Sequence, residues 1–450
     1  HNTMPDDIDE KGEGGKLLPS QVNGAGDDEQ TDSVKTREDL LREMRELRDE
    51  NARLRASIKK QESSDRTEFP TGTKRLITAL ISLTIYNILY FVPGFYERII
   101  AFFILLILAK LAGLPFAPMY IPPERRMQML VIALTFAPLQ MIECLLAYVF
   151  IIWYFRDNWF VLTIMLGYGA WIYIDKSPSR GGYKRLKKIF RHLPHYRLVA
   201  DYYPCRLVRT TPLDPKHNYL FGYHPHGIIS VGAQANFGTD STGFDVKFPG
   251  IDLTLMTLNL TFKIPFFREL VLAHGLASCG RNSINHHLES KEGGNAVMLV
   301  IGGAAESLDA HPDLMDLTLK NRKGFVRLAL RHGAHLVPVI SFGENEVFTG
   351  IPNQRGSFTR DVQNWLQKKT GVAPVLFVGR GIFNYAFGVF PHRRPITSVV
   401  GAPLPCPKVA DVKKGDPIID EWHAKYLEAL KDLYEEHKSQ HGMTAEMRFF

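Results

Sequence analysis

The segment of the sequence with the clearest chemical potential is His224-Pro225-His226-Gly227, two histidines separated by one proline and followed by a glycine. An apolar, aromatic stretch at 218–223 precedes it and is typical of a buried strand that ends at His224. A histidine can take a proton from an alcohol near neutral pH, and a carboxylate that fixes its tautomer improves it as a base. The segment therefore predicts general-base chemistry at the end of a strand.

A second segment, "GGAAES" at 302–307, supplies such a carboxylate in Glu306. It follows another apolar run, 296–301, that is typical of a buried strand, and its paired glycines let the backbone approach a ligand closely. Ligands of α/β sheets bind beyond the carboxyl ends of the strands, so Glu306 and the two histidines are predicted to meet there. We expect His226 to be the base, His224 to support it and Glu306 to orient the imidazole.

The sequence contains no Gly-x-Ser-x-Gly turn that would hold a nucleophilic serine. A histidine base without a covalent nucleophile suggests direct acyl transfer, in which an acceptor hydroxyl attacks a thioester and a backbone N–H stabilises the oxyanion. The cationic pair after residue 321 is a candidate for binding phosphates. The candidates for binding the substrate or the oxyanion are Pro225, Gly227, Gly302, Gly303, Arg322, Lys323 and Glu344.

Structural readings of the same residues stay open. Glu306 could cap a helix that begins near Ser307, and either histidine could simply bond to the backbone. His311 and Asp316 have a His-x4-Asp spacing that could form a rival catalytic pair, although their segment is polar and follows no buried strand. No carboxylate or cysteine stands at ligand spacing from His286 and His287, so we expect no metal.

The elements that must position these residues alternate in type. The segment 321–332 predicts an amphipathic helix that Gly333 ends, and 334–342 and 373–379 are further predicted strands. This alternation indicates an α/β domain, which we place at 176–450.

Two apolar blocks precede that domain. Residues 70–118 contain hydrophobic segments that we expect to associate with a membrane, and 128–175 contains two long apolar runs joined at Arg156-Asp157-Asn158, which predicts a transmembrane hairpin. The basic stretch 176–191 follows the hairpin and marks the cytosolic side, or binds anionic lipid headgroups or ligand phosphates. An even number of spans places both chain ends and the α/β domain in the cytosol.

The first part of the chain is polar. We expect residues 1–32, rich in Gly, Asp, Glu and Lys, to be a disordered tail and 33–62 to form a short heptad helix. A parallel homodimer through 36–60 and a solvated, monomeric helix are both open. The seam of this helix consists of Leu40, Met44, Leu47, Asn51, Leu54 and Ile58.

Charge and cysteine content narrow the class of protein. The 450 residues carry a net charge of +7 with four cysteines. No zinc-finger, Walker or aromatic RNA-binding signature accompanies the basic balance, so nucleic acid is not an expected partner. The cysteines lie far apart and form no CxxC pair, which suits a reducing compartment.

Several of these segments together resemble the diacylglycerol acyltransferase type 2 family, which includes monoacylglycerol and wax-alcohol acyltransferases. The resemblance rests on "HPHG" at 224–227, "GGAAES" at 302–307, "RKGFVRLAL", "LVPV" and "FGENEVF", and runs from about 155 to 440. The family's Tyr-Phe-Pro motif is Tyr202-Tyr203-Pro204 here, a mild departure.

The resemblance implies a multi-pass enzyme of the endoplasmic reticulum membrane, also found on lipid droplets, with a cytosolic active site. Its members join acyl-CoA, a co-substrate and not a cofactor, to diacylglycerol and form triacylglycerol, and the family's essential HPHG corresponds to residues 224–227. Monoacylglycerol or a long-chain alcohol is the alternative acceptor. A non-enzymatic membrane or lipid-droplet scaffold that uses the heptad arm and hairpin is the alternative function.

Overall fold

The computed structural model describes residues 97, 100, 104, 107, 108, 111, 121–289, 292–351, 353, 356–371, 373–385 and 388–450. The predicted tail, the heptad helix with its dimer, and most of the predicted segment 70–118 lie outside the described residues. Those expectations stay predictions.

A mixed seven-stranded sheet, with the order β1-β10-β7-β2-β5-β3-β4, forms the centre of the α/β domain. The central strand β2 pairs in parallel with β5 and β7, and β10 runs antiparallel to β7. The α/β architecture predicted from the sequence is confirmed. The strands are β1 (Arg206–Arg209), β2 (Tyr219–His224), β3 (Asp252–Thr257), β4 (Ala277–Ser278), β5 (Asn295–Val300), β7 (His335–Phe342) and β10 (Thr397–Val400).

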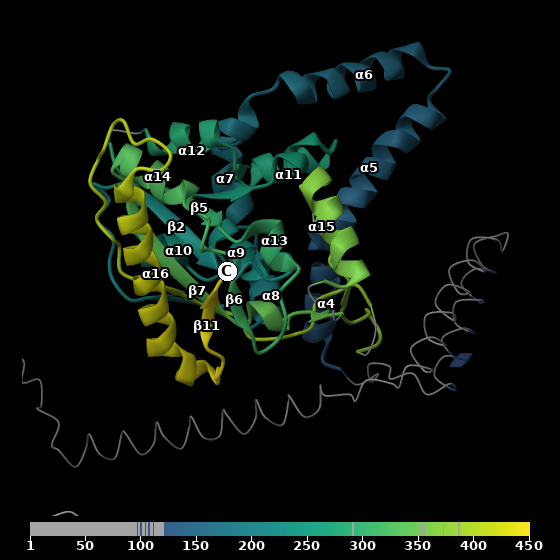
Figure 1. The fold of residues 1–450 in the computed structure, drawn as a ribbon. Coiled ribbons are helices and arrows are strands. Elements are labelled where there is room, and N and C mark those ends of the chain that lie inside the picture. Colours follow the sequence, from purple (N-terminus) through teal and green to yellow (C-terminus); the bar gives the residue numbers. More distant parts are fainter. Residues whose placement is uncertain are drawn as a thin grey trace, which may run out of the picture. The chain divides into compact units, whose positions relative to one another are not determined.

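Helices cover both faces of this sheet (Figure 1). All six residues of β2 are buried, and their side chains alternate between the two faces because the side-chain period of a strand is two. Leu220 packs into one apolar cluster, whereas Tyr219, Phe221 and Tyr223 pack into another. The first cluster includes side chains of α12 (Arg281–Leu288), α14 (Gly324–His332) and α16 (Pro417–Lys438), and the second those of η2 (Gln234–Gly238), α10 (Phe244–Lys247) and α11 (Phe267–Ala273).

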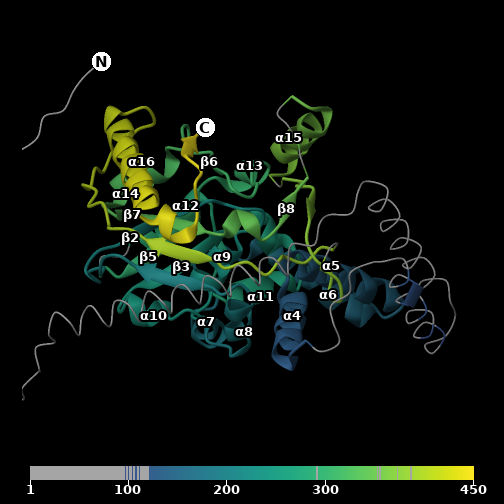
Figure 2. The same ribbon diagram turned by 90° about the horizontal axis from the view of Figure 1, so that it is seen from below.

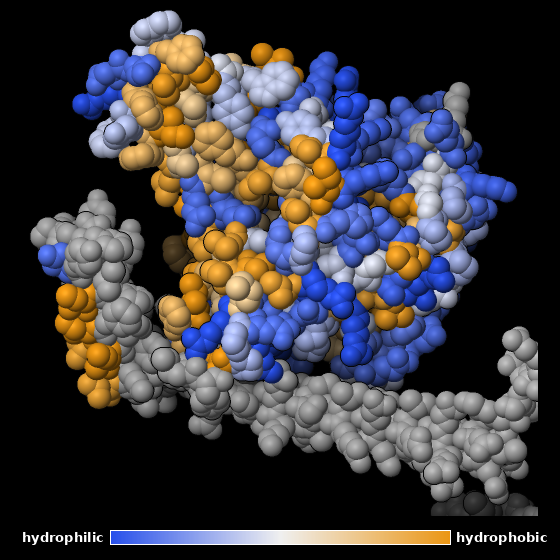
Figure 3. Space-filling model, turned by 180° about the vertical axis from the view of Figure 1, so that it is seen from behind, coloured by the Kyte–Doolittle hydropathy of each residue, from blue (hydrophilic) through white to orange (hydrophobic). Residues whose placement is uncertain are grey.

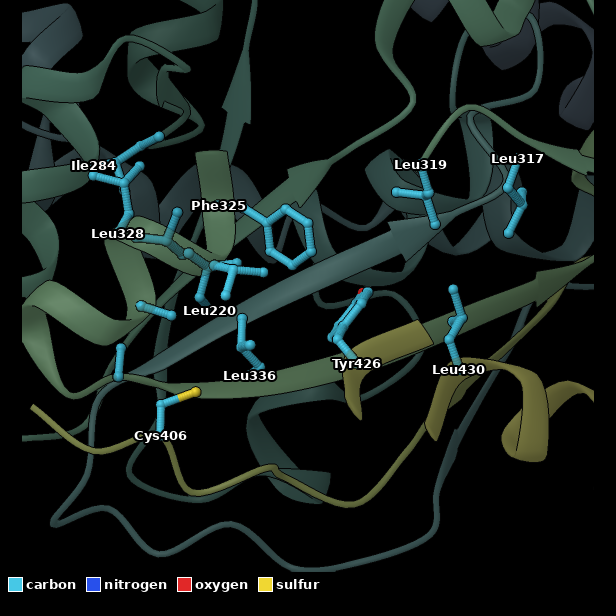
Figure 4. Packing of buried hydrophobic residues seen from close by; sticks show 14 of the residues in the cluster. Leu220, Ile284, Leu317, Leu319, Phe325, Leu328, Leu336, Cys406, Tyr426 and Leu430 are labelled. Carbon is cyan, nitrogen blue, oxygen red and sulfur yellow. The ribbon is translucent and has the colours of Figure 1, made fainter. Parts of the chain in front are cut away.

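Figure 4 shows how the first cluster brings distant segments together. Leu220 and Leu336 belong to neighbouring strands, Phe325 belongs to α14, and Tyr426 and Leu430 extend from α16. The predicted helix 321–332 begins at Gly324 and ends, as expected, at Gly333, whose φ of +66° glycine adopts without steric cost.

The predicted strand 373–379 is wrong for the most part. Only β9 (Phe377–Val378) is extended, and it pairs with β8 (Thr349–Gly350) in a separate two-stranded sheet. Pro374 has no N–H to donate to a ladder, and Val375 N bonds back to Ala373 O in a turn.

The predicted hairpin 128–175 divides differently from the expectation. Its first eight residues belong to α4 (Pro123–Thr135), which packs against α8 (His195–Tyr202) and buries Met129 and Ile132. Phe136 is extended, and Pro138 lies in the first turn of the next helix, where its missing N–H is tolerated. The long apolar run is therefore interrupted at Phe136, and α4 is part of the α/β body.

The remaining part of the hairpin consists of α5 (Ala137–Tyr154) and α6 (Trp159–Ile174). Asn158 caps α6 by accepting from Phe160 N and Val161 N, both at 3.2 Å. Among the described residues, α5 alone is long and apolar enough to cross a membrane, judged by length and composition, and none of its residues is buried. Both helices extend away from the sheet (Figures 1 and 2).

Shorter elements complete the domain. They are η1 (Ser177–Ser179), α7 (Lys184–Arg191), α9 (Val231–Ala233), η3 (Asn259–Lys263), α13 (Gly303–Ser307), β6 (Met315–Leu317), η4 (Glu344–Glu346), α15 (Phe358–Thr370), η5 (Ser439–His441) and β11 (Met447–Phe449).

Candidate active site

His224 is the last residue of β2 and is fully buried. Its Nε2 lies 3.0 Å from the hydroxyl oxygen of Tyr426 on α16, and no partner for its Nδ1 occurs in the described part of the chain. Burial lowers the pKa of this imidazole to about 3, because the charged ring would lose its hydration. His224 is thus a neutral ring enclosed by protein.

His226 lies beyond the strand end, and its side chain keeps part of its surface exposed. Its Nδ1 is 3.0 Å from Gly227 O and 2.9 Å from Ser307 Oγ. Because a carbonyl oxygen can only accept, the contact with Gly227 assigns the proton to Nδ1 and leaves a lone pair on Nε2. No hydrogen bond to Nε2 occurs among the described residues, so this lone pair is available to a ligand.

The electrostatic setting keeps the His226 ring neutral. Burial lowers the pKa of its imidazole below the ordinary value, against a smaller opposite effect of the hydrogen bond to Gly227. The ring therefore stays unprotonated at neutral pH, which is the state that a general base needs before it takes a proton.

Glu306 contacts the backbone of the histidine segment and not the ring. Its Oε1 accepts from His226 N at 2.6 Å, and its Oε2 accepts from Thr318 N at 2.8 Å. The expectation that Glu306 orients the imidazole is corrected here, since the groups that hold the ring are Ser307 and Gly227. Burial raises the pKa of the Glu306 carboxyl to about 7.

Steric constraints explain why glycine occupies three positions in the two motifs. Gly227 has a φ of +59°, and a Cβ there would lie 2.8 Å from Glu344 Cγ. A Cβ on Gly302 would lie 2.1 Å from Glu306 Oε2, so this glycine makes room for the carboxyl that holds the loop. Gly303 faces open space, and its φ of +60° alone favours glycine.

Glu344 lies behind the histidine segment. It is fully buried, and its Oε2 accepts from Tyr223 Oη at 2.6 Å and from Gly232 N at 2.8 Å. Burial raises the pKa of its carboxyl to about 7. This side chain braces the strand end and the helix that follows it, and it has no exposed surface with which to meet a substrate.

The other predicted residues lie outside this hydrogen-bonded group. Pro225 is buried between the histidines. Lys323 pairs with Asp420 at 2.7 Å, whereas Arg322 is exposed and makes no ion pair within the described residues. In the rival pair, Asp316 on β6 accepts two hydrogen bonds from Arg448, each 2.7 Å long, and no hydrogen bond joins it to His311 among the described residues.

Sequence reasoning missed three groups that hold the site. Ser307 lies inside the quoted "GGAAES" motif, so its hydroxyl could have been considered as a partner of the ring. Tyr426 and Thr318 gave no local signal, because both act through tertiary contacts: Tyr426 bonds to His224, and the backbone N–H of Thr318 donates to Glu306.

A histidine with a free ring nitrogen beyond a strand end can accept a proton from a hydroxyl, which is a step that acyl transfer needs, and comparison with known proteins indicates the same class of reaction. The family described as diacylglycerol acyltransferase matches residues 151–450. A 2-acylglycerol O-acyltransferase 1 of Bos taurus is 44% identical over 332 residues, which cover 73% of this chain and 96% of that protein.

Two further relatives carry a different acceptor in their names. A diacylglycerol O-acyltransferase 2 of Dictyostelium discoideum is 42% identical over 72% of this chain and 95% of its own length. One of Danio rerio is 45% identical over 64% of this chain and 79% of its own length. The chain belongs to the diacylglycerol acyltransferase family, and it is an acyltransferase.

Proposed function

We propose that this chain transfers a fatty acyl group from acyl-CoA to the free hydroxyl of diacylglycerol and forms triacylglycerol, with His226 as the general base. The observation that carries the proposal is the set of contacts of the His226 ring, from which we infer its tautomer. Its Nδ1 is held by Gly227 O and Ser307 Oγ, and its Nε2 is left without a partner among the described residues.

The reaction follows from that arrangement. The acceptor hydroxyl gives its proton to His226 Nε2 while its oxygen attacks the thioester carbonyl carbon, which places a negative charge on the carbonyl oxygen. The Gly227 N–H, which has no hydrogen bond within the described residues, is our candidate donor to that oxyanion. The C–S bond then breaks, and the thiolate of CoA takes the proton from the imidazolium.

We assign supporting roles to the buried groups. His224 cannot reach a substrate, since its ring is enclosed and bonded to Tyr426, so it positions the strand end. Glu306 and Glu344 hold the loop from two sides through backbone N–H groups. Arg322, exposed and without an ion pair among the described residues, is our candidate for a CoA phosphate.

The assignment of the base predicts the effect of His226→Ala. General-base catalysis contributes about 10²–10⁴-fold, so we expect acyl transfer to fall by that factor. The measurement is triacylglycerol formed from oleoyl-CoA by the purified full chain, with His286→Ala, an exposed histidine on α12, as the matched control. Undiminished synthesis by the His226 variant would refute His226 as the base, whereas no synthesis by the purified wild-type chain would refute the enzyme assignment and favour the scaffold.

Monoacylglycerol is the second candidate acceptor, because one relative is named a 2-acylglycerol O-acyltransferase. Both acceptors offer an uncharged hydroxyl, and the histidine chemistry is the same for each. Assaying the same preparation with monoacylglycerol, diacylglycerol and a long-chain alcohol separates them. A kcat/KM at least tenfold higher for monoacylglycerol would reverse our choice.

We further propose that α5 and α6 attach the enzyme to the endoplasmic reticulum membrane with the site on the cytosolic side. Trp153, Tyr154 and Trp159 stand exposed at the turn between the helices, where aromatic side chains favour a membrane interface. Asn259 begins an Asn-Leu-Thr sequon that is glycosylated only in the lumen. We expect endoglycosidase treatment to leave the electrophoretic mobility unchanged, and a glycan at Asn259 would contradict this topology.

A further inference from the structure

The short helix α7, "KRLKKIFR", divides its cations between two faces. Lys187 and Arg191 are four residues apart, so they share the face that packs on the body. Lys187 Nζ lies 2.5 Å from Asp252 Oδ1, and Arg191 donates to Leu253 O at 3.2 Å and lies 3.6 Å from Asp245. These two cations are neutralised by the body and fix the helix in place.

The outer face of α7 carries three cations that lack an ion-pair partner in the described part of the chain. Lys184, Arg185 and Lys188 are exposed, and none of them has an ion-pair partner among the described residues. Leu186 and Ile189 are 39% and 60% exposed beside them. This mixture of exposed cations and aliphatic side chains on one helix face is typical of a helix at a membrane surface.

Polar contacts attach α7 to the base of the α5–α6 arm. Tyr168 of α6 and Tyr183, the residue before α7, both donate to the Glu269 carboxylate, at 3.1 and 2.6 Å. Arg268 forms an ion pair with Asp175, the residue after α6. The position of α7 therefore follows that of the arm.

Apolar surface also extends from the arm onto the neighbouring part of the α/β domain. Figure 3 shows an apolar band that runs from the projecting helices onto the body, bordered by strongly hydrophilic side chains. Outside α7, exposed apolar side chains on the neighbouring elements include Tyr173 and Ile174 at the end of α6, Leu258 and Leu260 near η3, and Leu270 on α11, which contacts α7.

We propose that α7 is a lipid-docking helix. Lys184, Arg185 and Lys188 bind the headgroups of anionic phospholipids in the membrane that holds the arm, while Leu186 and Ile189 enter the interface. The proposal rests on the membrane attachment proposed above and adds a lipid class to it. A rule of topology requires only that basic residues lie near a span, and it does not explain why two cations are buried in ion pairs while three are left exposed beside aliphatic side chains.

The test measures lipid binding and not turnover. The purified full chain is placed in neutral detergent micelles, and dansyl-phosphatidylserine is titrated in while energy transfer from the protein's tryptophans is recorded. Each cation near an anionic surface changes the affinity about fivefold, so Lys184→Gln/Arg185→Gln/Lys188→Gln should bind about a hundredfold more weakly. Because salt screens exposed charges, the affinity of the wild-type chain for the lipid should fall when the salt concentration rises from about 0.05 to 0.5 M. The affinity of the Gln variant of α7 should change little over the same range.

Two further variants keep the result interpretable. Lys408→Gln/Lys413→Gln/Lys414→Gln removes the same charge from exposed positions before α16 and should bind as the wild type does. Lys184→Arg/Arg185→Lys/Lys188→Arg keeps the charge and should also bind normally, whatever the Gln variant does to folding.

Several outcomes would overturn the proposal. The first is an equal loss of lipid affinity in the α7 Gln variant and in the control Gln variant before α16. The second is an unchanged affinity in the α7 Gln variant, and the third is a loss of affinity in the charge-preserving α7 variant. Equal binding of dansyl-phosphatidylcholine, or displacement of the lipid by micromolar CoA, would also overturn it. Because no acyl donor is turned over, an inactive acyltransferase leaves this test valid, and lost lipid binding leaves the assignment of His226 standing.

Discussion

Replacing Glu306 by glutamine separates the two roles that this carboxyl could have. An orienting carboxylate would act on the imidazole of His226, whereas the structure gives Glu306 two backbone N–H donors on two different oxygens, at 2.6 and 2.8 Å. Glutamine offers a single acceptor oxygen, so its NH₂ group faces either His226 N or Thr318 N.

The size of the effect follows from one buried donor that loses its acceptor. Leaving such an N–H without a partner costs about 1–3 kcal/mol. Unfolding of a domain the size of residues 121–450 has an entropy of about 0.7 kcal/mol/K, so the melting temperature should fall by about 1–4 °C. Burial raises the pKa of the Glu306 carboxyl to about 7, so the comparison is made at pH 8, where the carboxylate predominates.

Glu344→Gln is the matched control. Glu344 is equally buried and burial likewise raises its pKa to about 7, but both of its hydrogen bonds end on Oε2. One amide oxygen can keep both, so the loss should be smaller than for Glu306→Gln. Thermal melting and the pH dependence of acyl transfer are measured on all three proteins. If Glu306→Gln melts like the wild type but shifts the acidic limb of the activity profile, Glu306 acts on the ring and our reasoning is wrong.

Two further predictions concern the ring of His226. Ser307→Ala removes one neutral hydrogen bond to Nδ1, which is worth about 0.5–1.5 kcal/mol, so kcat should fall roughly 2- to 13-fold with KM nearly unchanged. Ser307→Thr keeps the hydroxyl and should retain most of the activity. A wild-type kcat in the alanine variant would exclude a positioning role for Ser307. Burial lowers the pKa of the His226 imidazole, and the base form predominates above that pKa. The acidic limb of kcat/KM should therefore lie below about 6.5, the ordinary value for histidine, and a limb above it would contradict this setting of the base.

The sequence was a good guide to the centre of the sheet. The strand that ends at His224 and the helix that ends at Gly333 were predicted within a few residues, because apolar runs and a glycine stop are local signals. The carboxyl-end rule also brought His226 and Glu306 into one group correctly, since it depends on topology alone.

The contacts within the site could not be obtained in the same way. Which atom of the histidine segment Glu306 contacts depends on the short helix α13, whose direction no pattern specifies. Tyr426 meets His224 across 202 residues of sequence, and on α16 it looks like any other core position. The apolar run is interrupted at Phe136, next to Pro138 in the first turn of α5. This proline was a local signal for a helix boundary, but a prediction based on the hydrophobicity of the run overlooked it.

The contacts between the C-terminal part of the chain and the histidine segment have a consequence for biosynthesis. Thr318, which fixes Glu306, follows β6, and β6 pairs with β11 at 447–449, while Tyr426 closes over His224. A ribosome adds these residues long after α5 and α6 have left its exit tunnel. With the membrane attachment proposed above, the nascent protein reaches its bilayer while its acyl-transfer centre is still unassembled, and it becomes competent only near the end of translation.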